Sequence, residues 1–397
     1  MNKKDNKVII ITAIAVIGCV AIVAIVARYF LNVRTPDMPV SPQKSVDITA
    51  LKSSDGQPLL FPQEEKVIPP RPENPSALAE DDPLHWYDME YAGWNVEKAP
   101  MPKSPGDGPG GKYVIFLKMV DHPYNTAYSN GLKQVADAYG IKVKTMVANS
   151  NVNIQGQQAD QAIRERPDMV IINPVEAQAC LRLLKKMNEA GLPVIASNLL
   201  VSDDSMKYCL SWTGPDDWGQ MRKLAHEFAR RMNYQGGYCI IRHRPGSSPY
   251  FARTWAAVTE LKKIAPKMKL LAKQTTDLEA EKSMQVVSDW ITRFGPELKG
   301  IFSADDSGAQ TGINQAVQNA NRQDIIRVAA GNSKVGMDFI KQGQLHAVTY
   351  QTAEGVGALA MLLAAEWFSG RDIPAVRYLP IRIITKDNVD DYYPPQW

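Results

Sequence analysis

The sequence predicts an α/β protein with two doubly wound parallel-sheet lobes, preceded by an N-terminal transmembrane helix. From Lys112 onward, short apolar runs rich in β-branched residues alternate with amphipathic helical stretches. Strands that alternate with helices form parallel sheets covered on both faces. The pattern repeats about nine or ten times in about 285 residues, which is too often for one ordinary open sheet. Two lobes therefore fit best, and a single barrel is the alternative.

The composition is that of a globular protein with a full core. The 397 residues are 45% hydrophobic and 22% charged. The net charge of +3, from 45 basic and 42 acidic residues, gives no reason to expect a nucleic-acid partner. The four cysteines form neither a disulfide framework nor a CxxC zinc motif.

The N-terminal segment, residues 1–33, contains twenty consecutive uncharged residues from Val8 to Ala27. A helix of about 20 residues is needed to cross a bilayer. Lys3, Lys4 and Lys7 favour a cytoplasmic N-terminus and an extracytoplasmic body. Three interpretations stay open: a retained anchor, which we favour, a lipoprotein signal with Cys19 in a lipobox-like context, and a cleaved signal peptide.

Residues 34–111 are rich in proline and have little helical or strand periodicity. They hold 14 of the 27 prolines, so we interpret them as a semi-rigid tether. An aromatic cluster at 85–94 interrupts this segment. It is a contact for a partner or, the interpretation that we favour, a strap packed on the domain surface.

The repeating region supplies the expected strands and helices. The clearest helical patterns are 176–191 and 283–295. The apolar runs that we expect to form strands are 112–119, 142–148, 168–174, 193–199, 238–243, 269–274, 300–305, 325–332 and 345–351.

Polar or aromatic side chains follow most of these runs. In open α/β sheets, ligands bind beyond the carboxyl ends of the strands, so these side chains are candidates for a binding site. They are Lys118, His122, Tyr124, Asn173, Asn198, Asp305, Asp306, Asn332 and Gln351.

At these residues the chain resembles the periplasmic sugar-binding proteins of the ribose and galactose type, the solute-binding components of ABC importers. The resemblance runs from about residue 112 to the end. It rests on the order and spacing of "VIINPVEAQA", "GLPVIASN", "TGPDDWGQ", "GSSPYFARTWAAV", "IFSADDSGAQTGINQAV" and "VAAGNSK".

The resemblance implies the type I periplasmic binding protein fold, in which three hinge crossings join two lobes that close on a ligand. The solute-binding domain would span 112–397. One lobe would comprise about 112–214 and 352–380, and the other about 215–351 and 381–397. The crossings would fall near Gly214, Gln351 and Pro380.

The resemblance also implies which side chains contact the ligand. Carboxylates accept hydrogen bonds from hydroxyls, guanidinium donates, and amides do both, while Tyr124 offers a flat face to C–H groups. The implied ligand-binding residues are Lys118, His122, Tyr124, Asn125, Asn198, Asp217, Arg253, Asp305, Asn332 and Gln351.

Three positions depart from the family pattern. Leu199 stands where ribose binders have an arginine, Leu278 where an aromatic residue stacks on the sugar, and Asn332 where a carboxylate is common. No spacing matches the family's calcium loop, so we predict no metal and no cofactor. We interpret Asp305 as an acceptor for ligand hydroxyls and Asp306 as the cap of the following helix.

These observations predict a binding protein rather than an enzyme, since the sequence has no GxSxG, HExxH or helix-opening GxGxxG motif. We expect a monomeric, membrane-tethered protein on the periplasmic or extracellular face. It would bind a monosaccharide or related polyol and deliver it to the permease subunits of an ABC importer. The alternative is a sensor that presents its closed form to a membrane kinase or chemoreceptor.

Overall fold

The computed structural model describes residues 47–62, 66–94 and 96–397. The predicted transmembrane segment, 1–33, and the first part of the predicted tether lie outside these residues. Within the part of the chain that is described, no helix combines the length and the apolar character that a membrane crossing requires.

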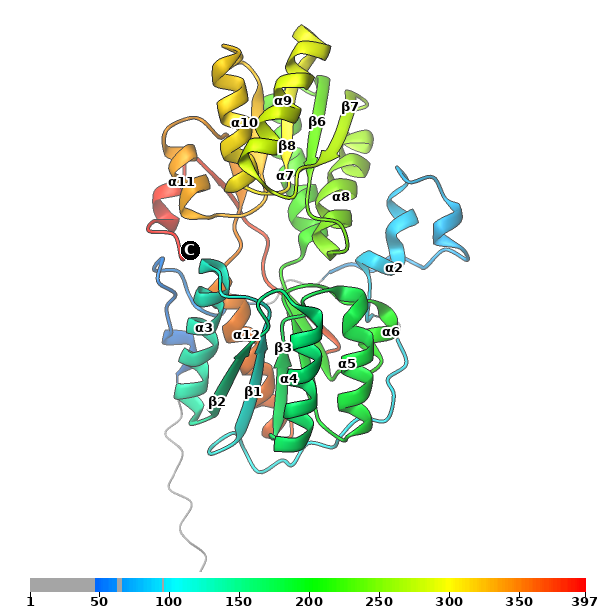
Figure 1. The fold of residues 1–397 in the computed structure, drawn as a ribbon, viewed down its shortest axis with the longest axis vertical. Coiled ribbons are helices and arrows are strands. Elements are labelled where there is room, and N and C mark those ends of the chain that lie inside the picture. Colours follow the sequence, from blue (N-terminus) through cyan, green and yellow to red (C-terminus); the bar gives the residue numbers. More distant parts are fainter. Residues whose placement is uncertain (1–46, 63–65, 95) are drawn as a thin grey trace, which may run out of the picture. The chain divides into compact units, whose positions relative to one another are not determined.

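The first lobe is built on a six-stranded parallel sheet, as predicted (Figure 1). Its strand order is β11-β5-β4-β3-β1-β2. The strands are β1 (Tyr113–Lys118), β2 (Lys142–Val147), β3 (Met169–Ile172), β4 (Val194–Ser197), β5 (Ser211–Gly214) and β11 (Val376–Tyr378).

Helices cover both faces of this sheet because alternate residues of its buried strands point to opposite sides. Val114 and Phe116 of β1 pack with α3 and α12, while Ile115 and Leu117 pack with α4 and α5. The helices are α3 (Pro123–Tyr139), α4 (Val152–Glu165), α5 (Ala177–Glu189), α6 (Asp203–Met206) and α12 (Ala353–Phe368).

The second lobe repeats this architecture with the order β12-β10-β9-β8-β6-β7, in which only the β10–β12 pair is antiparallel. Its strands are β6 (Gln235–Arg242), β7 (Lys267–Thr275), β8 (Leu298–Ser303), β9 (Ile326–Ala329), β10 (Ala347–Thr349) and β12 (Ile383–Thr385). Its helices are α7 (Asp217–Arg231), α8 (Ser248–Ile264), α9 (Ala280–Phe294), η4 (Gly295–Glu297), α10 (Gly308–Asn319), α11 (Lys334–Lys341) and η5 (Val389–Tyr392).

The chain passes between the two sheets three times. It leaves the first sheet after β5, returns after β10 and leaves again between β11 and β12. Gly214 ends β5, Gln351 follows β10 by two residues, and Pro380 lies between β11 and β12. A direct hydrogen bond also joins the lobes, since Leu200 N donates to Ser248 Oγ at 3.0 Å.

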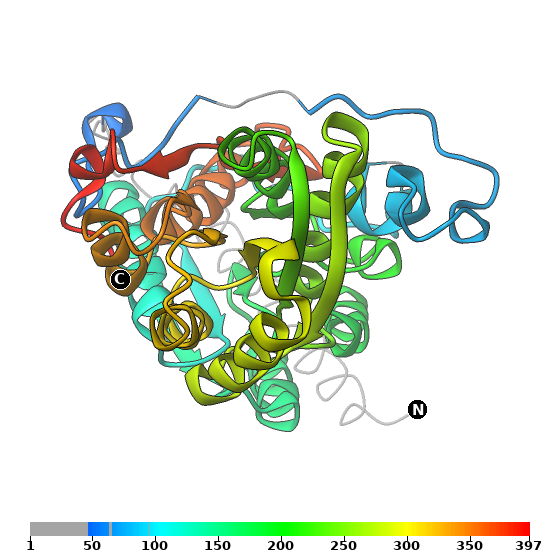
Figure 2. The same ribbon diagram turned by 90° about the horizontal axis from the view of Figure 1, so that it is seen from above.

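The described residues between 47 and 111, which we call the strap, pack against both lobes. The strap contains η1 (Ile48–Ala50), η2 (Pro75–Ala77), η3 (Pro83–Trp86) and α2 (Tyr87–Glu90). Figure 2 shows it (blue to cyan) along the outside of the domain. Leu59 is buried in the first lobe, and Trp86 stacks on Trp255 of the second lobe with ring centroids 5.3 Å apart. The aromatic cluster at 85–94 therefore contacts the domain itself.

A cluster of charges anchors the strap beside the connection from β5 to α7. The Glu90 carboxylate is fully buried and accepts two hydrogen bonds from the guanidinium of Arg222 on α7. Lys66 Nζ lies 3.5 Å from Glu90 and 2.8 Å from Asp216. The same ammonium lies 4.7 Å from the ring centroid of Tyr378 on β11, so this one side chain contacts both lobes.

Candidate functional site

The sequence-predicted residues of the first lobe lie at or just beyond the carboxyl ends of β1 and β4. Lys118 is the last residue of β1, and His122 caps α3 by accepting a hydrogen bond from Tyr124 N. Asn198 follows β4 with a φ of +76°, a left-handed conformation that asparagine tolerates better than most residues. The Tyr124 hydroxyl donates to Asn198 Oδ1 at 3.0 Å, which fixes the tyrosine ring.

The side chains of two further first-lobe residues, Lys118 and Asn125, are not hydrogen-bonded to Tyr124 or Asn198 within the described residues. The Lys118 ammonium is buried and bonds the exposed carboxylate of Asp121 at 2.6 Å. Asn125 is buried, and its Oδ1 has no hydrogen-bond partner among the described residues. The ammonium of Lys118 has three donors and the amide oxygen of Asn125 is unpaired, so both side chains can form further hydrogen bonds.

A row of buried polar atoms extends this edge of the sheet. Ser197 and Thr213 are in register on β4 and β5, and Asn173 follows β3. Ser197 Oγ, Thr213 Oγ1 and both amide atoms of Asn173 are buried without partners in the part of the chain that is described. Buried polar groups are normally hydrogen-bonded, so these atoms have unused hydrogen-bonding capacity.

The predicted residues of the second lobe form a connected hydrogen-bond network. Arg253 Nε lies 2.9 Å from Asp217 Oδ1, and Arg253 Nη1 donates to the carbonyl of Ala304 at 2.9 Å. Gln351 Nε2 also donates to Asp217 Oδ1, at 3.4 Å. The network thus presents guanidinium, carboxylate and amide groups together.

Asn332 joins this network through the backbone. Its Oδ1 accepts a hydrogen bond from Gln351 N at 2.9 Å, whereas its buried Nδ2 has no acceptor within the described chain. The carboxylate that is common at this position in sugar binders could not donate from that atom. Asn332 therefore offers a donor where a carboxylate would offer only acceptors.

The role of one of the two adjacent aspartates differs from the prediction. Asp305, not Asp306, caps α10, because its Oδ2 accepts from Ala309 N at 2.9 Å and Ser307 N at 3.2 Å. Asp306 is fully buried and turns the other way, where it accepts from Ser333 N at 2.7 Å. The interpretation of Asp306 as the cap of α10 is thus wrong.

Glycines make room for the buried Asp306 carboxylate. A Cβ added to Gly336 would lie 2.0 Å from Asp306 Oδ2, and one added to Gly331 would lie 2.5 Å from Oδ1. Burial, and then the neighbouring charge of Asp305, raise the pKa of Asp306. Burial also raises the pKa of Asp305, against the hydrogen bonds from Ala309 and Ser307 and the charge of Arg253.

Side chains of the two lobes act on each other electrostatically at this site. Burial raises the pKa of Tyr124, the Asp217 charge adds to that rise, and Arg253 opposes it. Burial lowers the pKa of His122, an effect that the carboxylate of Asp305 opposes. The structure thus brings the tyrosine and histidine of the first lobe within range of the charged network of the second.

One residue at this site was not predicted. The Trp397 ring lies 5.3 Å from the Tyr124 ring, edge to face at 85°, and 6.4 Å from the His122 ring. Leu278, where the resemblance places an aromatic residue, instead directs its carbonyl toward Gly308, whose Cβ would lie 2.4 Å away. No periodic pattern or motif surrounds Trp397, so the sequence carried no signal for it.

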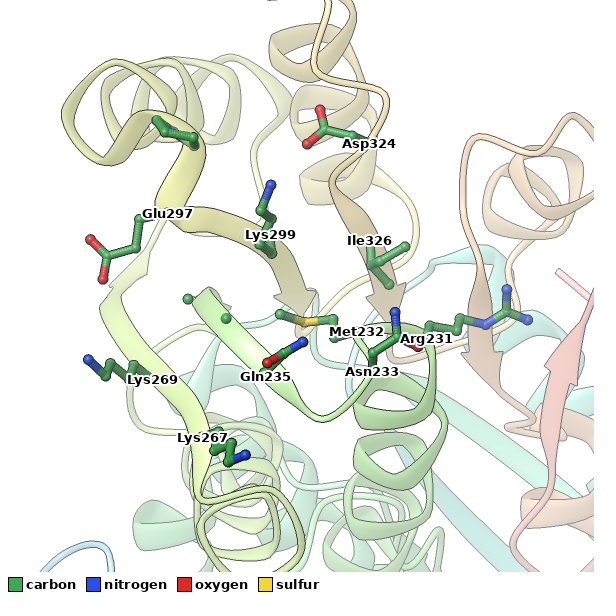
Figure 3. A pocket seen from close by; sticks show the side chains of 13 residues that line it. Arg231, Met232, Asn233, Gln235, Lys267, Lys269, Glu297, Lys299, Asp324 and Ile326 are labelled. Atoms are coloured by element: carbon green, nitrogen blue, oxygen red, sulfur yellow. The ribbon is translucent and has the colours of Figure 1, made fainter.

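A pocket of about 640 Å³ lies at the opposite edge of the second sheet (Figure 3). It is lined at the amino ends of β6 to β9, and Lys267, Lys269 and Lys299 are among its residues. None of the predicted site residues lies there. Within the part of the chain that is described, no cluster of acidic, histidine or cysteine residues could hold a metal ion.

Comparison with known proteins decides the family. A sequence model described as the periplasmic binding protein domain matches residues 113–372. The chain belongs to this family. Family membership confirms the resemblance seen in the sequence and implies an extracytoplasmic location.

Individual relatives are binding proteins as well. A xylitol-binding protein of Mycolicibacterium smegmatis is 26% identical over 266 residues, 67% of this chain and 74% of that protein. A ribose import binding protein of Salmonella typhimurium is 21% identical over 275 residues, 69% of this chain and 90% of that protein. This periplasmic binding protein is therefore a solute-binding protein and not an enzyme.

Solved structures show the same fold. An ABC transporter solute-binding protein from Bacillus halodurans with bound myo-inositol gives a TM-score of 0.66 at 19% identity, covering 73% of this chain and 100% of that one. The two parallel-sheet lobes are therefore confirmed as a type I periplasmic binding fold.

Proposed function

We propose that this protein is a membrane-tethered, extracytoplasmic binding protein that captures a sugar or sugar-like polyol between its lobes and delivers it to an ABC importer. The observation that carries the proposal is the Arg253–Asp217–Gln351 network. The charges of Asp217 and Arg253 also act on the pKa of Tyr124 in the first lobe. A sugar needs this combination, because its hydroxyls both donate and accept while its C–H groups need an apolar surface.

The relatives support this class of ligand. Those compared above are named for xylitol and ribose, and one solved structure holds myo-inositol. These three compounds share several hydroxyl groups and carry no charge. We therefore propose an uncharged polyhydroxylated ligand. Hydrogen bonds to Arg253 and Asp305 would be charge-assisted and stronger than those between neutral groups.

The test is calorimetric titration of the full chain, purified in mild detergent, with xylitol, D-ribose and myo-inositol. We expect at least one to bind, and Arg253→Ala to weaken that binding about 10- to 100-fold, since a hydrogen bond from a charged group contributes about 1.5–3 kcal/mol. A thermal shift provides a second readout, because ligand at 100 times its Kd adds about 2.7 kcal/mol of stability.

Arg322→Ala is the matched control. Arg322 Nε also lies 2.8 Å from a carboxylate, that of Asp324, and its Nη atoms donate to the carbonyls of Gly295 and Leu298. Asp324, however, lines the pocket at the opposite edge of the sheet. Affinity equal to that of the unsubstituted protein is expected for Arg322→Ala. Equal weakening by both substitutions, or no binding of any of the three compounds, would exclude the proposed site.

The tether is the second part of the proposal. It rests on the apolar run from Val8 to Ala27 and its preceding lysines. We expect the full chain to stay in the membrane fraction after a carbonate wash and a chain lacking residues 1–33 to be released. The intact mass of the membrane-bound protein separates the two anchors, since a retained helix keeps residues 1–18 and a lipoprotein begins at a modified Cys19.

A sensor remains the second candidate because a retained anchor keeps the binding lobes beside membrane partners. The two functions differ in the partner that recognises the closed form. Co-purification with a permease and its ATPase supports import, and co-purification with a kinase or chemoreceptor supports sensing.

A further inference from the structure

Trp397 lies where the two lobes come together at the candidate site. Its ring lies edge to face against Tyr124, and the ring of His122 lies 6.4 Å away. Both of those residues belong to the first turn of α3 or its cap, in the first lobe. The backbone oxygen of Trp397 accepts a hydrogen bond from Lys334 N, the first residue of α11 in the second lobe, at 2.7 Å.

Gln396, the residue before Trp397, is held in place by hydrogen bonds to both the nitrogen and the oxygen of its side-chain amide. Gln396 Nε2 donates to Asp55 Oδ2 and to Thr352 Oγ1, each at 3.0 Å, and Oε1 accepts from Glu354 N at 2.9 Å. Asp55 is itself buried and accepts from the Tyr350 hydroxyl at 2.9 Å. Three bonded partners, Asp55 of the strap and Thr352 and Glu354 at the start of α12, therefore hold the side chain next to Trp397.

Several of these residues lie outside the part of the chain that the family model matches. The family match covers residues 113–372, so Asp55, Gln396 and Trp397 all lie outside it. The strap and the C-terminal segment meet through the Asp55–Gln396 hydrogen bond. Two segments outside the matched residues thus cooperate to place one aromatic ring beside the residues of the candidate site.

The indole also has an unused hydrogen-bond donor. Trp397 Nε1 is buried and has no acceptor among the described residues. A buried tryptophan N–H normally finds a partner, and leaving it unpaired costs about 1–3 kcal/mol. The ring and this N–H together match an uncharged polyol, which offers C–H groups to the face and a hydroxyl oxygen to the donor.

We propose that Trp397 is a ligand-binding residue: its indole forms the second aromatic wall of the site, beside Tyr124, and its Nε1–H donates to a hydroxyl oxygen of the bound polyol. This wall takes the place of the aromatic residue that is missing at Leu278. The inference rests on the proposed function and concerns a residue outside the part of the chain that the family model matches.

The experiment is calorimetric titration of the full chain with xylitol, D-ribose and myo-inositol, using Trp397→Ala and Trp397→Phe. An aromatic contact and a hydrogen bond each contribute about 0.5–1.5 kcal/mol, so Trp397→Ala should weaken binding about 10- to 100-fold. Trp397→Phe keeps the apolar face and loses only the N–H, and should weaken binding about 3- to 10-fold. Binding should also change the tryptophan fluorescence of the unsubstituted protein by more than that of Trp397→Phe.

Tyr393→Phe is the control, since it removes a hydrogen bond from the same segment, between the Tyr393 hydroxyl and Asp338 Oδ1 at 3.0 Å. Its affinity should be unchanged. Unchanged or tighter binding by Trp397→Ala would mean that the residue only joins the lobes, and equal weakening by Tyr393→Phe would mean that the segment acts through stability. Either result overturns the inference while leaving the proposed function intact. If none of the three compounds binds the unsubstituted protein, the proposed function fails and the inference fails with it.

If Trp397→Ala does not fold, Trp397→Phe and the fluorescence change decide. A Trp397→Phe protein with the affinity and fluorescence response of the unsubstituted protein would overturn the inference.

Discussion

Removal of the Glu90 charge should destabilise the protein far more than removal of a similar charge elsewhere in the strap. Glu90 is fully buried and bonded twice by Arg222, with Lys66 Nζ 3.5 Å away. Glu90→Gln keeps the shape of the side chain but leaves Arg222 without its counter-charge. Breaking a buried pair in this way costs about 3–5 kcal/mol, a large part of the roughly 5–15 kcal/mol that stabilises a typical domain.

Asp88→Asn provides the comparison within the same segment. Asp88 also receives two bonds from one guanidinium, at 2.6 and 2.8 Å from Arg71, but the side chains are 47% and 45% exposed. Exposed pairs contribute about 0–1 kcal/mol. Urea unfolding followed by circular dichroism measures both variants, and limited proteolysis reports whether the strap detaches first.

A double substitution distinguishes the loss of the ion pair from the loss of the Glu90 side chain itself. Replacing both partners, Glu90→Met with Arg222→Met, should cost less than Glu90→Met alone, because no uncompensated cation then stays buried. Equal losses from Glu90→Gln and Asp88→Asn, or a loss below about 1 kcal/mol for Glu90→Gln, would refute the reasoning, since burial could then not be what makes this pair matter.

Two further predictions concern the interiors of the lobes. A Cβ on Gly357 of α12 would lie 2.0 Å from the carbonyl oxygen of Tyr128 on α3, so Gly357→Ala should destabilise the protein by more than about 2 kcal/mol. A Cβ on Gly156 would meet nothing closer than 3.9 Å, so Gly156→Ala should stabilise α4 by about 0.5–1 kcal/mol. Similar melting temperatures for the two variants would contradict the close approach of α3 and α12. Because burial raises the folded-state pKa of Asp306, its carboxyl favours folding below the unfolded value of 3.8 and loses that contribution as pH rises through the folded value. Between pH 5 and pH 8, the melting temperature should therefore fall more for the unsubstituted protein than for Asp306→Asn, and equal slopes would show that Asp306 is not the group responsible.

Much of the fold could be predicted because the parallel strands are continuous apolar runs. All nine predicted runs contain strands, and the helical patterns at 176–191 and 283–295 coincide with α5 and α9. The strands β5, β11 and β12 were not among those runs, and of these β5 is the one inside a sheet rather than at its edge. Its four residues, Ser211–Gly214, include only two strong β-formers, and it is a strand because β4 and β11 pair with its two edges.

The roles of individual side chains were harder to predict than the strands. The sequence places Asp305 and Asp306 at the end of β8, and successive residues leaving a strand point in different directions. Which of them caps α10 depends on the turn at Ser307 and on the space left by Gly331 and Gly336, which comes from another part of the chain. Trp397 was missed for the same reason, since its place depends on Asp55, more than 300 residues earlier in the sequence.

The strap also bears on how this protein can close on a ligand. Trp86 and Glu90 are anchored to the second lobe through Trp255 and Arg222, whereas Gly93 N donates to Asp203 Oδ1 of the first lobe at 2.8 Å. Only two residues separate the anchors at Glu90 and Gly93. The strap therefore crosses between the lobes beside the β5–α7 connection, where Lys66 contacts Asp216. Closure of a two-lobed binding protein is a rotation about such connections. A short crossing at the rotation axis allows that motion, whereas the same crossing far from the axis would have to stretch or detach.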